Sequence, residues 1–115
     1  MEMRIHATRL TSNFKRKLYN EIADVSTWAF TSYSLDKISK RDIPAENLSE
    51  AVVKGKVIEY HNTKGGTRRV LLRCEDGTCA VVDLDKQTII TAYKNHADYN
   101  HPNLDKSKYL FGVSL

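Results

Sequence analysis

The 115-residue sequence lacks any long apolar run. No stretch approaches the roughly 20 apolar residues that a membrane-spanning helix requires. The opening Met1-Glu2-Met3-Arg4 is not followed by the apolar segment of a secretory signal peptide. We therefore expect a cytoplasmic protein that does not enter a membrane.

Cysteine is also scarce, because Cys74 and Cys79 are the only two. Together with four scattered histidines they do not show the spacing of zinc ligands, so no metal site is expected. No nucleotide-binding fingerprint is present, and no cofactor is expected. The two cysteines flank Asp76-Gly77, so we expect them to face each other across a hairpin as reduced thiols.

The composition is that of a folded protein, with 41% hydrophobic and 28% charged residues. Its length suits one domain covering residues 1–115, with little room for a deep cleft. A net charge of +4 permits a polyanionic partner but does not require one.

Apolar residues recur at helical spacing in the first half of the chain. This pattern predicts helices over about 12–25, 34–41 and 44–55, within a helical part that spans 10–54. In the second helix, Leu35 and Ile38 are expected to face the core.

After Gly55 the pattern changes to alternation, which predicts strands. These cover 56–61, 68–74, 79–84 and 87–94, and residues 95–115 form a polar and aromatic tail with an edge strand near 109–113. Segregated helices and strands indicate the α+β class. We expect N-terminal helices packed on one face of a four-stranded, mainly antiparallel sheet over 56–94.

Turn chemistry predicts the register of these strands. A two-residue turn at Asp76-Gly77 places Arg73 opposite Ala80, and a second turn at Asp85-Lys86 places Ala80 opposite Thr91. One sheet face then has an apolar centre with Ala80, Val82 and Ile89, surrounded by Arg69, Arg73, Thr91 and Tyr93. Such a mixed face indicates either a site or a surface covered by the tail.

Several other residues carry possible chemistry. His6, His61, His96 and His101 are candidates for proton transfer, with His61 and His96 best placed, although each is more typical of a surface histidine. The segment 64–69 is a basic, glycine-containing loop suited to phosphate contact or simply to a solvated hairpin. The basic cluster at 13–17 has the same two interpretations.

Three segments, 33–43, 52–59 and 88–93, resemble the barnase–EndoU–colicin–RelE superfamily of small ribonucleases and toxins. One branch has a helix His-Ala-x-x-Arg-x-x-x-Arg-x-Ile, then Gly-x-Val/Ile-Ile-Glu, and a sheet that closes with Ile-Val-Thr-Val-Tyr. The resemblance covers roughly residues 31–94 and implies a site between the helix and the sheet face.

Within this resemblance, Arg41 matches the second helix arginine and Lys37 replaces the first. Thr91 and Tyr93 match the final Thr-x-Tyr. Tyr33 stands where that branch carries histidine, so either Tyr33 donates a proton or the fold has been kept for binding alone.

These observations predict a metal-independent ribonuclease or toxin-like domain that cleaves RNA through the ribose 2′-hydroxyl. The expected catalytic residues are Tyr33, Lys37, Arg41, Thr91 and Tyr93. The expected RNA-binding residues are Lys64, Arg68, Arg69 and Arg73. For a toxin-like domain an immunity protein is an expected partner. The alternative is a non-catalytic protein of phage or mobile-element type that docks on a nucleic acid or a host protein through its sheet face.

Overall fold

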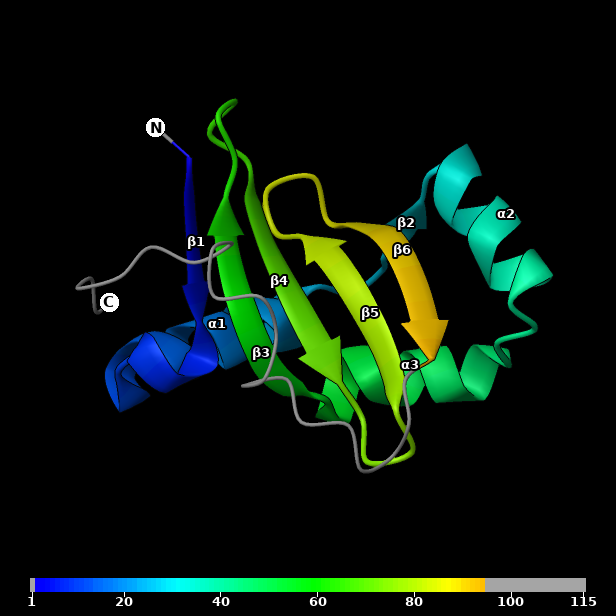
Figure 1. Ribbon diagram of the computed structural model, residues 1–115, viewed down its shortest axis with the longest axis horizontal. Coiled ribbons are helices and arrows are strands. Elements are labelled where there is room, and N and C mark those ends of the chain that lie inside the picture. The colour runs from blue at the N-terminus through cyan, green and yellow to red at the C-terminus, as the bar shows by residue number, and fades with distance from the viewer. Residues whose placement is uncertain (1, 95–115) are drawn as a thin grey trace.

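A mixed six-stranded sheet with helices on one face forms the fold, which is α+β as predicted (Figure 1). The computed structural model describes residues 2–94, so the predicted tail and its edge strand lie outside the described residues. The strand order is β1-β3-β4-β5-β6-β2. The strands are β1 Met3–His6, β2 Ala29–Phe30, β3 Lys56–Asn62, β4 Arg68–Arg73, β5 Thr78–Asp83 and β6 Thr88–Lys94.

The prediction of four strands is therefore incomplete. β1 pairs antiparallel with β3, and β2 pairs parallel with β6, which extends both edges of the predicted sheet. β1 has four residues and β2 has two, so neither is long enough for alternation to reveal it in the sequence.

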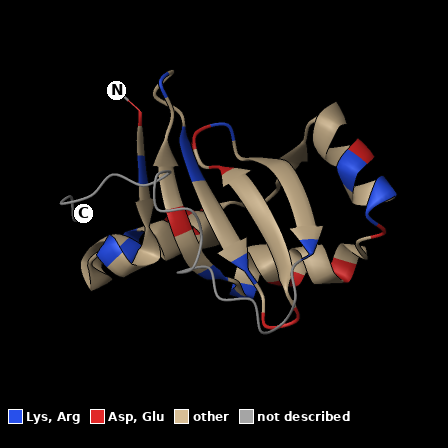
Figure 2. Cartoon of the chain, in the orientation of Figure 1, with Lys and Arg blue, Asp and Glu red and all other residues tan. Residues whose placement is uncertain are grey.

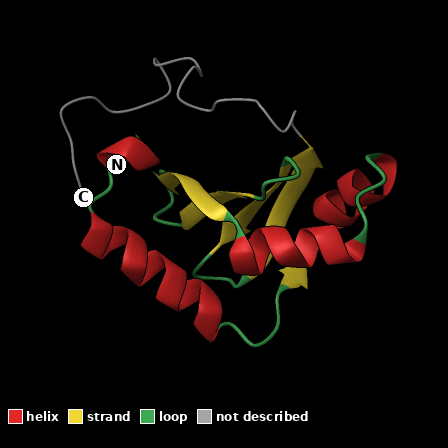
Figure 3. Cartoon of the chain, turned by 90° about the horizontal axis from the view of Figure 1, so that it is seen from below, coloured by secondary structure: helices red, strands yellow, loops and turns green. Residues whose placement is uncertain are grey.

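The three predicted α-helices are present as α1 Ser12–Asp24, α2 Ser32–Lys40 and α3 Ala45–Lys54. Thr11 caps α1, because its hydroxyl accepts a hydrogen bond from the Phe14 amide at 3.2 Å. Thr31 and Ser34 form a reciprocal capping box at the start of α2. α1 and α3 lie against the sheet, and α2 lies beside β6 (Figure 3).

This position of α2 corrects one prediction. Leu35 is 54% exposed instead of buried, whereas Ile38 packs against the core. Because α2 contacts the edge of the sheet and not its broad face, only part of the helix surface is covered. Ser34, held by the capping box, is the fully buried residue of α2.

The hairpin between β4 and β5 has a different register from the predicted one. The Cys74 amide donates to the Thr78 carbonyl at 2.8 Å, which encloses a three-residue loop at 75–77. Gly77 has a φ of +92°, as the last residue of such a loop requires. Arg73 consequently pairs with Cys79 and not with Ala80.

The same shift separates the two cysteines. Cys79 belongs to the face of Arg73, while Cys74 packs against the core on the helix side. Both are free thiols, but they do not face each other across the strands as predicted.

A second irregularity lies between β5 and β6. Val82 pairs with Ile89 as predicted, but the register then shifts and Val81, not Ala80, pairs with Thr91. The two shifts cancel for β6, so Arg69, Arg73, Thr91 and Tyr93 share one face. Ala80, Val82 and Ile89 do not join them, because all three are buried in the core beneath the helices.

The core lies between the sheet and the layer of α1 and α3. Its sheet residues come from five strands, including the edge strand β1. They are Ile5, Val57, Tyr60, Val70, Leu72, Ala80, Val82, Ile89 and Ala92. The opposite face of the sheet carries polar side chains around the apolar Leu71 and Val81.

We expect Gly77→Ala to lower the free energy of unfolding by about 1–2 kcal/mol, because an L-residue is strained at a positive φ. Gly65→Ala is the matched control, since Gly65 is exposed in another turn and has no positive φ. Urea denaturation measures both changes. Equal stabilities for the two variants would contradict the three-residue loop.

Candidate active site

Polar side chains from β1, β3, β4 and β6 lie together on the sheet face opposite the core. Since Ile5, Tyr60 and Val70 point into the core, their neighbours along each strand point the other way. We call this surface the polar face. Its main polar residues are Arg4, His6, Glu59, His61, Arg69, Arg73, Thr91 and Tyr93. The same face also carries Leu71, Cys79, Val81 and the buried Asp83, which is opposite Arg69.

The centre of the polar face is the pair His6 and Glu59, which are directly opposed in the register of β1 and β3. On its other side, Glu59 is opposite Leu71 of β4. Arg69 and Arg73 flank Leu71 on the same strand, so they lie diagonally on either side of Glu59. An imidazole, a carboxylate and two guanidinium groups are thereby collected from three adjacent strands.

His6 is held by the residues that follow β1. Its Nδ1 accepts a hydrogen bond from the Thr8 amide at 3.2 Å, so in the neutral ring the proton is on Nε2. The Thr8 hydroxyl lies 3.0 Å from the same Nδ1 and can accept from it when the ring is charged. Burial lowers the pKa of His6, and the negative charge of Glu59 acts in the opposite direction.

Arg4 connects Glu59 to His61. Its Nε lies 3.6 Å from Oε2 of Glu59, and its terminal nitrogen lies 3.3 Å from Nδ1 of His61. If Arg4 donates to that Nδ1, the His61 Nε2–H donates to the Glu2 carboxylate 3.0 Å away. The hydrogen bond from His61 lowers the pKa of Glu2. The side chain of Glu59 is only 14% exposed, so Arg4 supports a largely buried carboxylate.

Tyr93 and Arg73 adjoin the buried thiol of Cys79. Burial raises the pKa of Cys79 to about 11, although the charge of Arg73 and a hydrogen bond with Tyr93 act in the opposite direction. Cys79 is therefore not a thiolate nucleophile near neutral pH. Its role is to occupy the space between Arg73 and Tyr93, with which it is in register on the two neighbouring strands.

The five predicted catalytic residues occupy three places. Arg41 donates to the Ala92 carbonyl at 2.7 Å and contacts the Thr91 hydroxyl at 3.4 Å, at the edge of β6. On the outer surface of α2, the Lys37 ammonium lies 5.3 Å from the centre of the Tyr33 ring, and Tyr33 is 57% exposed. Tyr93 is on the polar face. The structure thus brings together Arg41 with Thr91, and Tyr33 with Lys37.

The predicted RNA-binding residues also separate. Arg69 and Arg73 belong to the polar face, and Lys64 is exposed in the turn between β3 and β4. Arg68 is instead held between two carboxylates, with Asp85 at 2.9 Å and Glu21 of α1 at 3.0 Å. Because its guanidinium charge is already matched, Arg68 connects β4, α1 and the turn after β5.

Sequence reasoning underrated His6 and missed Glu59 and Arg4. His6 was one of four candidate histidines, and Glu59 ends the Gly-x-Val-Ile-Glu segment of the resemblance. Their proximity depends on β1, which periodicity does not reveal. The sequence signal for β1 is the apolar Ile5 between the polar Arg4 and His6. An alternation of only three residues is too short to predict a strand.

No protein family, no curated protein and no solved structure matches this chain. Over residues 2–94, no group of three or more His, Cys, Asp or Glu residues is arranged to hold a metal ion. No helix within that range is long and apolar enough to cross a bilayer.

Replacing Arg68 with alanine should lower the free energy of unfolding by about 1 kcal/mol in neutral solution, because the network is partly exposed. Hydrogen bonds from Arg68 lower the pKa of Asp85. The stabilisation is thus present above the unfolded-state pKa of Asp85 and is lost as the pH falls through its folded-state pKa.

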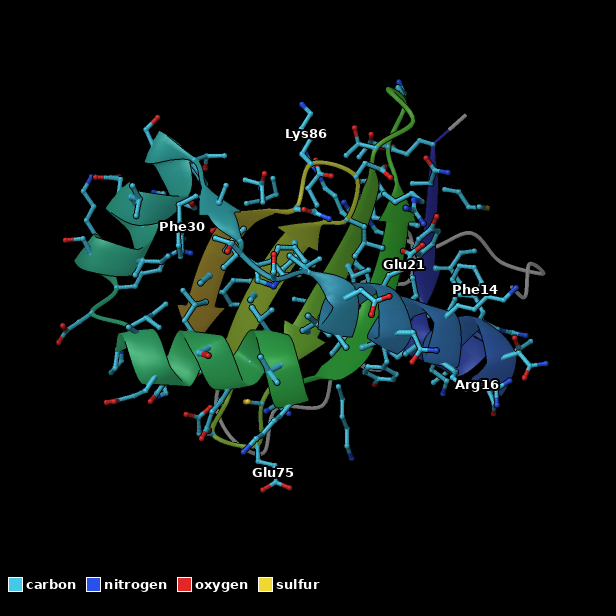
Figure 4. All side chains as sticks on the ribbon, turned by 180° about the vertical axis from the view of Figure 1, so that it is seen from behind. Phe14, Arg16, Glu21, Phe30, Glu75 and Lys86 are labelled. Carbon is cyan, nitrogen blue, oxygen red and sulfur yellow. The ribbon has the colours of Figure 1, made fainter. Side chains whose placement is uncertain are left out.

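The difference in free energy of unfolding between wild type and Arg68→Ala is therefore expected to be smaller at about pH 3 than at neutral pH. Urea titrations at the two pH values measure it. Arg16→Ala is the control, because Arg16 on α1 (Figure 4) donates to the uncharged Asn13 side chain and forms no ion pair within residues 2–94. A difference that is constant with pH would show that Asp85 is not the partner that matters.

Proposed function

We propose that the protein is a metal-independent ribonuclease whose active site is the polar face. The observation that supports this proposal is the placement of His6 directly opposite Glu59, with Arg69 and Arg73 beside them. A carboxylate and an imidazole are the two proton-transfer groups that this reaction needs. The two arginines supply positive charge for a phosphate that becomes more negative in the transition state.

In the proposed reaction, Glu59 accepts the proton of a ribose 2′-hydroxyl and that oxygen attacks the adjacent phosphorus. The bond from phosphorus to the 5′-oxygen breaks, and the His6 imidazolium gives a proton to that oxygen. The products are a 2′,3′-cyclic phosphate and a free 5′-hydroxyl. The nucleophile belongs to the substrate, so only acid–base and electrostatic groups of the protein take part.

The remaining predicted residues have supporting roles in this proposal. Tyr93 lies beside Arg73 across Cys79 and offers a ring for stacking against a base. Arg41 satisfies the Ala92 carbonyl at the edge of β6, and so helps to hold the strand that carries Tyr93. Lys37 and Tyr33 lie on the outer surface of α2, away from the reacting atoms.

Non-catalytic RNA binding through the same face is the second candidate. The Arg4–Glu59 ion pair at 3.6 Å favours it, because it already engages the carboxylate that the reaction would need as its base. The two candidates use the same surface but differ in whether the RNA is cut.

We expect wild-type protein to cleave single-stranded RNA in the presence of EDTA and to leave the 2′-deoxy analogue intact. Glu59→Gln and His6→Gln should each reduce kcat/KM by about 100-fold or more, the usual contribution of an acid or base. Glu46→Gln, on the exposed side of α3, is the matched control and should retain full activity. Mass spectrometry of the products should show the cyclic phosphate.

Circular dichroism and thermal unfolding should show that the two variants remain folded. Cleavage that survives in both folded variants would contradict the assigned roles. Tight RNA binding by the wild type without any cleavage would establish the second candidate instead.

The pH dependence of cleavage follows from the position of His6. Since His6 must be protonated to act as the acid, activity falls as the pH rises through its pKa, which burial lowers from the ordinary histidine value. We expect kcat/KM to decrease on the alkaline side of its pH profile, and to begin that decrease at a lower pH than an exposed histidine would give. His6→Gln should abolish the alkaline limb of the profile in the residual activity, and an unchanged limb would exclude His6 as the acid.

A further inference from the structure

A run of cations without any acidic residue begins at β1. Residues 3–20 contain Arg4, Arg9, Lys15, Arg16 and Lys17 and no aspartate or glutamate. In the structure they occupy β1, the 3-10 turn Ala7–Arg9 and the first half of α1. Figure 2 shows these basic positions at one end of the molecule, around β1 and the start of α1.

Four of these cations have no acidic partner among the described residues. Arg9, Lys15, Arg16 and Lys17 form no ion pair within residues 2–94, whereas Arg4, Lys40 and Arg68 each do. Arg16 donates to the Asn13 carboxamide at 2.7 Å, which leaves its charge uncompensated. An anionic partner can therefore bind these four cations.

The fold makes this basic segment continuous with the polar face. The N-terminal end of α1 projects beyond β1, so it is visible from the side of the polar face (Figure 1). The two regions meet at the end of β1, because His6 is followed directly by the 3-10 turn Ala7–Arg9 that leads to α1. Leu18 and Ile22 bury the apolar side of α1, which leaves Arg16 and Lys17 at the surface.

We infer that this segment, with Arg9, Lys15, Arg16 and Lys17, binds the backbone phosphates of RNA that extends past the scissile bond around the edge of β1. The inference rests on the proposed function and adds the class of substrate to it. The substrate is a polynucleotide with several nucleotides on one side of the cleaved bond. A dinucleotide occupies the polar face alone.

An anionic membrane surface would also attract these cations, but α1 is poorly suited to it. Helices that lie on a bilayer expose large apolar side chains beside their basic residues. The large apolar residues of α1 are turned toward the protein: Leu18 and Ile22 are buried and Phe14 packs on the core, so only Tyr19, at 38% exposed, remains outside. The nucleic acid is therefore favoured.

The test compares two triple variants of equal net charge. K15Q/R16Q/K17Q removes the cations of α1, and K40Q/K54Q/K86Q removes three exposed lysines on α2, α3 and the turn after β5. Fluorescence anisotropy measures the binding of a labelled single-stranded 20-nucleotide RNA at several salt concentrations. Parallel assays measure cleavage of that RNA and of a dinucleotide.

For K15Q/R16Q/K17Q we expect at least about tenfold weaker binding and a salt slope reduced by about 2, or about 0.7 per lost phosphate contact. The control variant should change neither value. Cleavage of the dinucleotide should be the same in both variants and in the wild type.

Equal binding by the two variants would overturn the inference while cleavage by the wild type still supports the proposed function. Binding that depends on α1, with no cleavage of either substrate, would support the inference and overturn the proposed catalysis. Capture of phosphatidylserine vesicles through Lys15, Arg16 and Lys17, without binding of RNA, would also overturn the inference.

Discussion

The antiparallel pairing of β1 with β3 is the interaction on which the rest of the site depends. It places His6 opposite Glu59 and Arg4 opposite His61, and it covers the edge of the predicted sheet. Ile5 stabilises this pairing because it is fully buried in the core. A short strand with one deeply buried side chain thus brings His6 next to Glu59 of β3, which are the two proton-transfer groups of the proposed reaction.

Two local irregularities determine which residues share the polar face. The three-residue loop at 75–77 shifts β5 by one position, and the break between Val81 and Val82 shifts β6 back. A one-residue shift moves every side chain of a strand to the other face. Because the two shifts cancel, Thr91 and Tyr93 remain on the face of Arg69 and Arg73, whereas either shift alone would move them to the other face.

The cations of the protein fall into compensated and uncompensated groups. Arg68 is bound by Asp85 and Glu21, and Lys40 by Asp36, so these charges stabilise local structure. Those of the first half of α1 form no ion pair in the described part of the chain. Ion pairing thus separates the cations that stabilise local structure from those that can bind a partner. Composition alone does not reveal which cations are paired. A net charge of +4 is compatible with either arrangement.

The sequence by itself determined the three helices, four of the six strands and the α+β class, because these depend on periodicity and capping within short segments. It also indicated that Arg69, Arg73, Thr91 and Tyr93 share a face, although through a register that is wrong at Ala80. Tertiary structure decided the rest. His6 and Glu59 are 53 positions apart in the chain, and only the packing of Ile5 and the β1–β3 hydrogen bonds bring them together. Such long-range pairing depends on burial in the assembled core, and no local pattern of residues encodes it.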